Sequence, residues 1–136
     1  MGTLYLPRAT KDIDIFVKAD ADNAKAVYAA LVGFGAPLQN IDVADFADPT
    51  KFLRFGREPA AVDLLPAIDG VDFETAWEHR VVGVIDPVTG LTAFFISEGD
   101  LIASKLAAGR LRDLADVEEL RTAAANRTAQ DNDKKN

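Results

Sequence analysis

The sequence predicts one α/β (α+β) domain in which helices flank a mixed β-sheet and a helical pair follows at the C-terminal end. Segments that alternate apolar and polar residues, as strands do, are interspersed with segments whose apolar residues recur every three or four positions. The chain has 136 residues, about the size of one domain, and its 49% apolar content is enough for an ordinary core. We therefore expect a single domain over residues 1–126 and a disordered polar tail over residues 127–136.

The first elements are a strand and a helix. Residues 11–17 alternate polar and apolar side chains at period two, which predicts a half-buried strand. Its core-facing side chains are then Ile13, Ile15 and Val17. Residues 21–31 have an apolar stripe at helical spacing, with Asp20 or Asp22 as the N-cap and an end near Gly33 and Gly35.

The middle of the chain predicts more strands and one short helix. Residues 41–50 are acidic and irregular, typical of a loop or a poorly defined helix. Strands are expected over residues 51–57 and 60–65, and a hairpin over 81–85 and 91–96. Between them, residues 72–80 predict a short helix whose aromatic residues, Phe73 and Trp77, pack into the core.

Two helices are predicted at the C-terminal end. Ser97 and Asp100 resemble a capping box that opens the first of them, and Gly109 closes or bends it. Apolar residues at helical spacing over residues 111–120 predict the second. The polar composition beyond that helix predicts the tail, because so few apolar residues cannot offset the entropy of ordering.

Composition excludes several classes of function. Without cysteine the chain has neither disulfides nor thiolate metal sites, and one histidine excludes a His-cluster zinc site. The net charge of −7, from 15 basic and 22 acidic residues, argues against sequence-independent binding of a nucleic-acid backbone. Neither a signal peptide nor an apolar stretch of bilayer-spanning length is visible, so we expect a cytoplasmic protein without membrane contact.

Three carboxylates are the candidate functional residues. Asp12 and Asp14 lie two apart on a predicted strand, so both project from one face about 6–7 Å apart. A bare Asp-x-Asp is usually just an exposed strand face. Asp63 is more informative, because it interrupts an apolar strand where an unpartnered carboxylate is costly.

Two interpretations of Asp63 follow from the sequence. It forms an ion pair with Arg54 or Arg57 of the preceding strand, or its strand lies beside the Asp12 strand and three carboxylates converge. Convergence would raise their pKa values unless a cation neutralises them, and Mg²⁺ is bound by carboxylate oxygens together with substrate phosphates.

Basic residues accompany the carboxylates in sequence. Arg8, Lys11, Arg54 and Arg57 flank the acidic strands, and Lys105, Arg110 and Arg112 lie around the junction of the last two helices. Cations near a metal–carboxylate site suit a polyphosphate. Alternatively, Arg110 with Asp113 and Arg112 with Asp116 form surface salt bridges at helical spacing, the interpretation we favour for Arg112.

Residues 8–17, Arg-x-Thr-x-Asp-Ile-Asp and its strand, resemble the signature element of minimal nucleotidyltransferases of the DNA-polymerase-β-like superfamily. Residues 57–65 are similar to the strand carrying the third carboxylate, and residues 68–77 and 100–116 to later parts of that domain in uncharacterised bacterial members. The likeness covers roughly residues 2–120. Its Asp-x-Asp alone is weakly specific, and the combination is more specific.

This resemblance implies a nucleotidyltransferase-like fold and a two-ion Mg²⁺ site. Asp12, Asp14 and Asp63 would be catalytic and metal-binding, while Arg8, Lys105 and Arg110 would bind the nucleotide phosphates. The implied reaction transfers a nucleoside monophosphate from an NTP to an acceptor hydroxyl on a protein or RNA, with pyrophosphate leaving.

The sequence departs from the family pattern at its start. Members carry a phosphate-binding Gly-Gly or Gly-Ser turn, followed by a helix, ahead of the Arg-x-Thr element, whereas here Met1 lies seven positions before Arg8. We therefore expect a degenerate member, a truncated start, or a turn supplied by a partner. An alternative function is a non-catalytic regulatory module of a toxin–antitoxin-like pair, binding a partner protein or forming a homo-oligomer; a third is metal-dependent phosphate hydrolysis.

Overall fold

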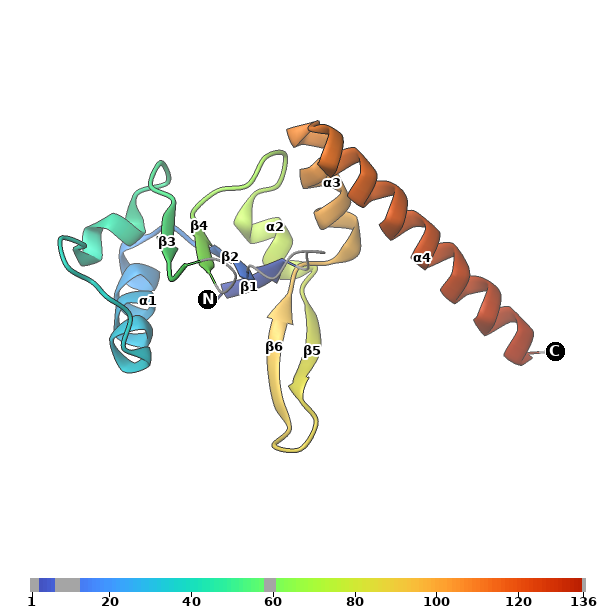
Figure 1. Ribbon diagram of the computed structural model, residues 1–136, viewed down its shortest axis with the longest axis horizontal. Helices are drawn as coiled ribbons and strands as arrows, with labels where there is room; N and C mark the ends of the chain where they lie inside the picture. The colour runs from blue at the N-terminus through green and yellow to red at the C-terminus, as the bar shows by residue number, and fades with distance from the viewer. Residues whose placement is uncertain (1–2, 7–12, 58–60, 136) are drawn as a thin grey trace.

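The computed structural model describes residues 3–6, 13–57 and 61–135, and their strands form one mixed sheet (Figure 1). Six strands lie in the order β3-β4-β2-β1-β6-β5 within these residues. Their bounds are β1 Thr3–Leu6, β2 Ile13–Val17, β3 Leu53–Phe55, β4 Val62–Leu65, β5 Val81–Asp86 and β6 Leu91–Phe95. β2 runs parallel to β4 and β1 parallel to β6, and the other neighbours are antiparallel. The predicted mixed sheet with flanking helices is confirmed.

β2 is covered on both faces, which the alternating pattern alone does not predict. Val17 is buried on the side of helix α1, and Ile15 packs against the same cluster. On the other face Phe16 is buried, its ring edge-on to Phe73 at 5.0 Å between centroids. The expectation that Ile13 faces the core is wrong, since 47% of this residue is exposed at the strand's start. Two apolar layers therefore enclose the middle of the sheet.

Helix α1, Ala21–Phe34, has the predicted caps and covers one face of the sheet. The Asp20 carboxylate accepts a hydrogen bond from the backbone N–H of Asn23 at 2.7 Å. The helix ends at Gly35, whose φ of 86° is the left-handed conformation that glycine adopts at low cost. The acidic segment that follows contains a 3-10 helix, η1, over Val43–Ala47.

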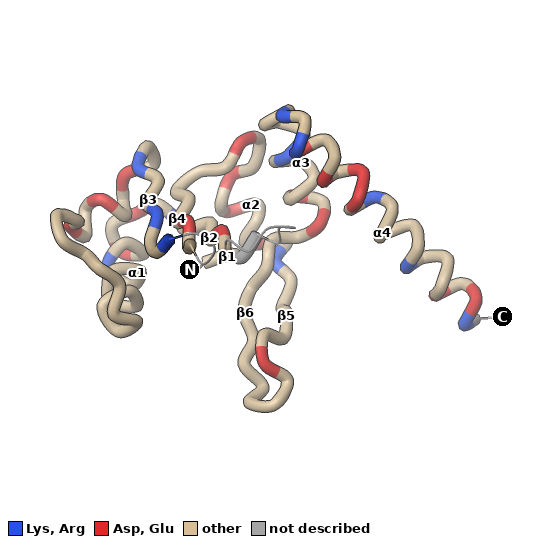
Figure 2. The backbone as a smooth tube through the Cα atoms, viewed as in Figure 1, with Lys and Arg blue, Asp and Glu red and all other residues tan. Residues whose placement is uncertain are grey.

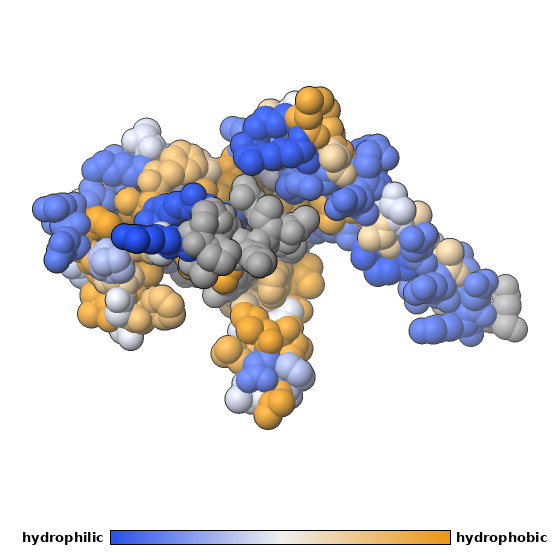
Figure 3. Space-filling view, viewed as in Figure 1, coloured by the Kyte–Doolittle hydropathy of each residue, from blue (hydrophilic) through white to orange (hydrophobic). Residues whose placement is uncertain are grey.

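Helix α2, Phe73–Glu78, covers the opposite face of the sheet and leads into the predicted hairpin of β5 and β6. Phe73 and Trp77 are partly buried against the core cluster of this face, as predicted. The hairpin then projects away from the other elements (Figure 1). Its apolar side chains are largely exposed, as the orange surface in Figure 3 shows.

Helices α3, Glu98–Ala108, and α4, Leu111–Lys135, form the predicted C-terminal pair. The Ser97 hydroxyl accepts a hydrogen bond from the Asp100 backbone, and Gly109 caps α3 in the left-handed conformation. The structure differs from the expectation of a disordered tail beyond residue 126, because α4 continues through Lys135. Helix-forming Ala, Arg, Gln and Lys residues continue its turns without an apolar face to bury. The far half of the helix is exposed and its surface is mostly hydrophilic (Figure 3).

β1 is a strand that the sequence reasoning missed. Four residues are too few to establish an alternating pattern, yet β1 lies between β2 and β6 and joins the two parts of the sheet. Leu4 is fully buried there.

Among the helices that the structure describes, none has the length and apolar character needed to cross a bilayer.

Candidate functional site

The two described carboxylates of the predicted triad lie side by side in the sheet. β2 and β4 are parallel neighbours, and Asp14 is in register with Asp63. Residues in register on neighbouring strands project from the same face, so both side chains lie on the face that carries Phe16. The predicted adjacency of these strands is confirmed. Asp12, the third predicted carboxylate, and Arg8 lie outside the described residues, as does Lys11.

Asp63 also forms the ion pair that the sequence left open. Arg54 of β3 is in register with Asp63, and its Nε lies 3.0 Å from the Asp63 carboxylate. Half of the Arg54 side chain is exposed, so solvent screens this pair and it contributes at most about 1 kcal/mol. Arg57, the other predicted partner, is exposed beyond the end of β3. The two interpretations of Asp63 are therefore compatible, since it has Arg54 on one side and Asp14 on the other.

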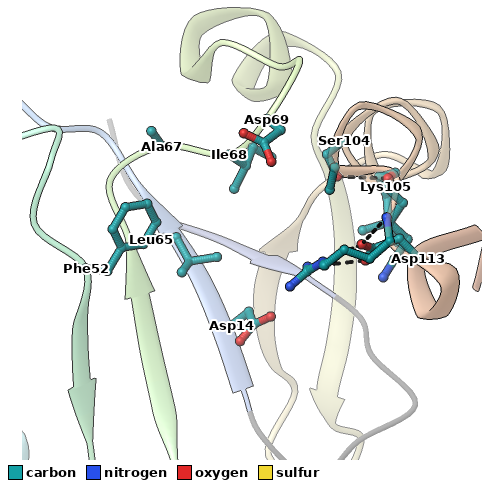
Figure 4. A pocket seen from close by; sticks show the side chains of 12 residues that line it. Asp14, Phe52, Leu65, Ala67, Ile68, Asp69, Ser104, Lys105 and Asp113 are labelled. Atoms are coloured by element: carbon teal, nitrogen blue, oxygen red, sulfur yellow. Dashed lines mark hydrogen bonds and ion pairs between the residues drawn. The ribbon is translucent and has the colours of Figure 1, made fainter.

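Asp14 borders a pocket of about 270 Å³ on this face of the sheet (Figure 4). Only 1% of this residue is exposed. The pocket lies between the sheet, the segment before α2, and the helices α3 and α4. Its lining is apolar toward β3 and β4, whereas the helices contribute polar and charged side chains together with Leu101 and Ala108. The lining residues are Asp14, Phe52, Leu65, Ala67, Ile68, Asp69, Leu101, Ser104, Lys105, Ala108, Arg110 and Asp113. Asp63 is next to this lining without being part of it.

Lys105, predicted to bind phosphate, lies in the helical wall of the pocket. It is on the buried stripe of α3 with Leu101 and Ser104, and 8% of it is exposed. Its ammonium donates to the Asp116 carboxylate of α4 at 2.7 Å. The pair of Arg112 with Asp116 that the spacing within α4 suggested is not formed in the described part of the chain, and Asp116 is instead paired with Lys105 across two helices. This pair fixes a positive charge at the pocket and joins α3 to α4.

Arg110, the second predicted phosphate-binding residue, follows α3 at the same wall. Its Nε donates to the Asp113 carboxylate at 2.6 Å, the i,i+3 pair that the sequence offered as its alternative role. This hydrogen bond lowers the pKa of Asp113, against the raising effect of burial, and raises the pKa of Arg110. Both basic side chains of the wall are therefore held by carboxylates of α4.

Several pocket residues were not predicted from sequence. Asp113 is buried at 4% exposure, Ser104 donates its hydroxyl hydrogen bond to the Leu101 carbonyl, and Asp69 precedes the turn at Gly70. Lys105, which was predicted, had a usable signal in the sequence, because it interrupts the apolar stripe of α3 much as Asp63 interrupts its strand. Phe52 and Asp69 carry no such signal, because Phe52 is an apolar residue within a predicted strand and Asp69 lies in a turn.

Gly70 explains how the segment before α2 approaches α3. Its φ is +72°, and a Cβ placed there would lie 2.7 Å from the Cβ of Ala107. Only glycine allows both the left-handed backbone and this close approach. Asp69 is thereby brought to the pocket beside the residues of α3.

The donor set fits a hard divalent cation. Asp14 and Asp63 supply carboxylate oxygens from neighbouring strands, the ligand type that Mg²⁺ prefers. Among the residues with described positions there is no cluster of three His, Cys, Asp or Glu that could hold a metal. The described pair would therefore need a further ligand, such as a substrate phosphate.

Comparison with known proteins agrees with this geometry. No match was found among curated proteins. A family model described as "Nucleotidyltransferase of unknown function (DUF6036)" matches residues 4–126, which include both carboxylates, the pocket and most of α4. The chain belongs to this family of nucleotidyltransferases of unknown function.

Proposed function

We propose that this protein is a Mg²⁺-dependent nucleotidyltransferase that transfers a nucleoside monophosphate from an NTP to a hydroxyl of a protein or RNA acceptor. The observation that carries the proposal is the register of Asp14 and Asp63 beside a pocket whose other wall holds Lys105 and Arg110. Carboxylates on one side and cations on the other suit a ligand that combines a metal ion with several phosphates.

The residues divide into two roles. Asp14 and Asp63, together with Asp12, would hold Mg²⁺, which when bound neutralises phosphate charge and activates the attacking hydroxyl. Lys105 and Arg110 would bind the phosphate oxygens. Each is held in the structure by a carboxylate of α4, so phosphate binding requires it to share or exchange that partner. In the transfer, the acceptor oxygen bonds to the α-phosphorus as the bond to pyrophosphate breaks.

Isothermal titration calorimetry tests the metal role. We expect the α,β-methylene analogue of ATP to bind in Mg²⁺ and to bind much more weakly in EDTA. Loss of a residue that only hydrogen-bonds to a metal ligand typically lowers metal affinity about 10- to 100-fold. Asp14→Asn and Asp63→Asn, which alter the ligands themselves, should each weaken binding of the analogue at least tenfold. Asp22→Asn, on the exposed surface of α1, is the matched control and should leave binding unchanged. Unaltered binding by both site variants would refute the assignment, provided that circular dichroism shows them folded.

A second candidate function, binding of another protein chain, is supported by the β5–β6 hairpin. Seven large apolar residues are exposed on it: Val81, Val82, Val84, Ile85, Val88, Leu91 and Phe94. β5 is also an outer strand among the described strands, and such long apolar edges pair readily with other strands. The hairpin carries few charges along its length (Figure 2).

The occupant that we propose for this edge is a second copy of the chain. If two β5 strands pair antiparallel about a twofold axis at Gly83, residue 80 of one copy lies opposite Asp86 of the other. Arg80, which precedes β5, then comes near that carboxylate, so the two ends of the edge have complementary charges. Sedimentation equilibrium should show a dimer that Val84→Lys disrupts. A monomer at all concentrations, or a complex formed only with a different protein, would exclude this pairing.

A further inference from the structure

The pocket has an exposed aromatic side chain that phosphate binding does not require. Phe52 lines the pocket and is 61% exposed, and it belongs to neither hydrophobic core cluster of the described chain. An exposed phenyl ring costs free energy in water unless something covers it. We propose that Phe52 is the platform on which the nucleobase of the donor nucleotide stacks, an inference that rests on the proposed function and deepens it.

The sheet places Phe52 on the same face as the carboxylates. Leu53 of β3 is in register with Leu64 of β4, so the preceding Phe52 lies across from Leu65. Leu65 is in turn in register with Phe16 of β2. This apolar row lies next to the charged row of Arg54, Asp63 and Asp14. The side chain of Phe52 therefore alternates with that of Leu53, which packs into the core of the opposite face.

The pocket is divided into an apolar and a charged part. Phe52, Leu65, Ala67 and Ile68 form the part toward β3 and β4, and Asp69 lies between this part and α3 (Figure 4). The part at α3 and α4 holds Ser104, Lys105, Arg110 and Asp113, together with the apolar Leu101 and Ala108. Asp14 lies below both in this view. A nucleotide has the same division, since an aromatic base is joined through the sugar to an anionic phosphate chain. With its phosphates at Lys105 and Arg110, its base reaches toward the apolar part.

The chemistry of this part predicts stacking without selection among bases. Leu65, Ala67 and Ile68 offer side chains that cannot hydrogen-bond to base edges, whereas every base has a π-face for the Phe52 ring. Stacking on an aromatic side chain typically changes affinity about 5- to 100-fold per base. We therefore expect purine and pyrimidine nucleotides to depend on Phe52 to a similar degree.

Calorimetry with three probes separates the base from the phosphates. The probes are the α,β-methylene analogues of ATP and UTP and inorganic tripolyphosphate, each with Mg²⁺. Phe52→Ala should weaken the binding of both nucleotide analogues about 5- to 100-fold and leave the binding of tripolyphosphate unchanged. Phe52→Trp should retain nucleotide binding. Phe34→Ala removes a ring that is 82% exposed at the end of α1, away from the pocket, and should change none of the three.

Each remaining outcome overturns a defined statement. If Phe52→Ala binds the nucleotide analogues as tightly as the native chain, the stacking inference is wrong and the proposed function stands. If Phe52→Ala weakens the binding of tripolyphosphate as much as that of the nucleotide analogues, Phe52 maintains the shape of the pocket and does not contact the base, which also overturns the inference. If the native chain binds tripolyphosphate but neither nucleotide analogue, the proposed function itself fails.

Discussion

Asp14 and Asp63 lie directly beside each other in the sheet, because β2 and β4 are parallel and these two residues are in register. Neighbouring strands are about 4.8 Å apart, so two like charges at this separation repel unless a cation is near. Arg54, in register with Asp63 on the next strand, supplies one positive charge from the outer side. The row across three strands thus places two carboxyl groups and one guanidinium group at the border of the pocket.

Removing the charge of Arg54 should strengthen Mg²⁺ binding. Arg54 competes with a metal ion for the Asp63 carboxylate, and its own side chain is half exposed. We expect Arg54→Gln to raise Mg²⁺ affinity about two- to fivefold, the effect of up to about 1 kcal/mol. The free energy of unfolding should change by less than that. Calorimetric Mg²⁺ titration and urea unfolding measure the two quantities, with Arg57→Gln as control. Unchanged affinity would show that Asp63 is not a metal ligand.

Acid should destabilise the helical wall of the pocket through Asp113. Its pKa is lowered from 3.8 chiefly by the hydrogen bond from Arg110, and the charge of Lys105 also lowers it. A lowered folded-state pKa contributes stability that is fully present well above pH 3.8 and is lost as pH falls through the lowered value. Carboxyl carbon NMR should show Asp113 titrating below 3.8, and Arg110→Gln should move its midpoint upward. A midpoint that does not move in this variant would contradict the assignment.

The pair between Lys105 and Asp116 should stabilise the docking of α4 on α3. Asp116→Asn leaves the nearly buried ammonium of Lys105 without its carboxylate. We expect the free energy of unfolding to fall by about 1–3 kcal/mol, the cost of losing a hydrogen bond to a buried charge. Urea denaturation measures this loss, and Glu119→Gln on the exposed face of α4 is the matched control. Equal stabilities of the two variants would mean that the pair does not stabilise the fold.

Substitution of Gly70 should disturb both stability and the pocket. Gly70→Ala adds a Cβ 2.7 Å from that of Ala107 and forces alanine into a backbone with φ of +72°. We expect a loss of about 1–3 kcal/mol in unfolding free energy, together with weaker nucleotide binding as the segment moves away from α3. Gly90→Ala is a useful control, because its φ is also positive but no atom lies within 4 Å of the added Cβ. If both variants lose the same stability, the close approach to α3 is unimportant.

Local patterns predicted most elements of the fold. The alternation over β2, the helical stripe and caps of α1, and the hairpin of β5 and β6 depend on neighbouring residues alone, which is why sequence is sufficient for them. β1 was missed because its four residues give too short a pattern. Ile13 was misplaced because alternation along a strand does not show where the elements packed against that strand end. The continuation of α4 shows that helix propensity can outweigh a polar composition.

The sequence by itself determined which charged residues interrupt apolar segments, Asp63 in a strand and Lys105 in a helix, and it placed Asp14 at a polar position of an alternating strand. Tertiary structure decided their neighbours, because strand order and register bring together residues that are 49 positions apart in the chain. Tertiary structure also decided the ion pairs, in which Asp63 pairs with Arg54 and Asp116 with Lys105, and it placed Phe52 at the pocket. The local sequence shows that a charged residue will be buried at a cost in free energy. The residue that offsets this cost can be far away in the chain, so only the tertiary structure identifies it.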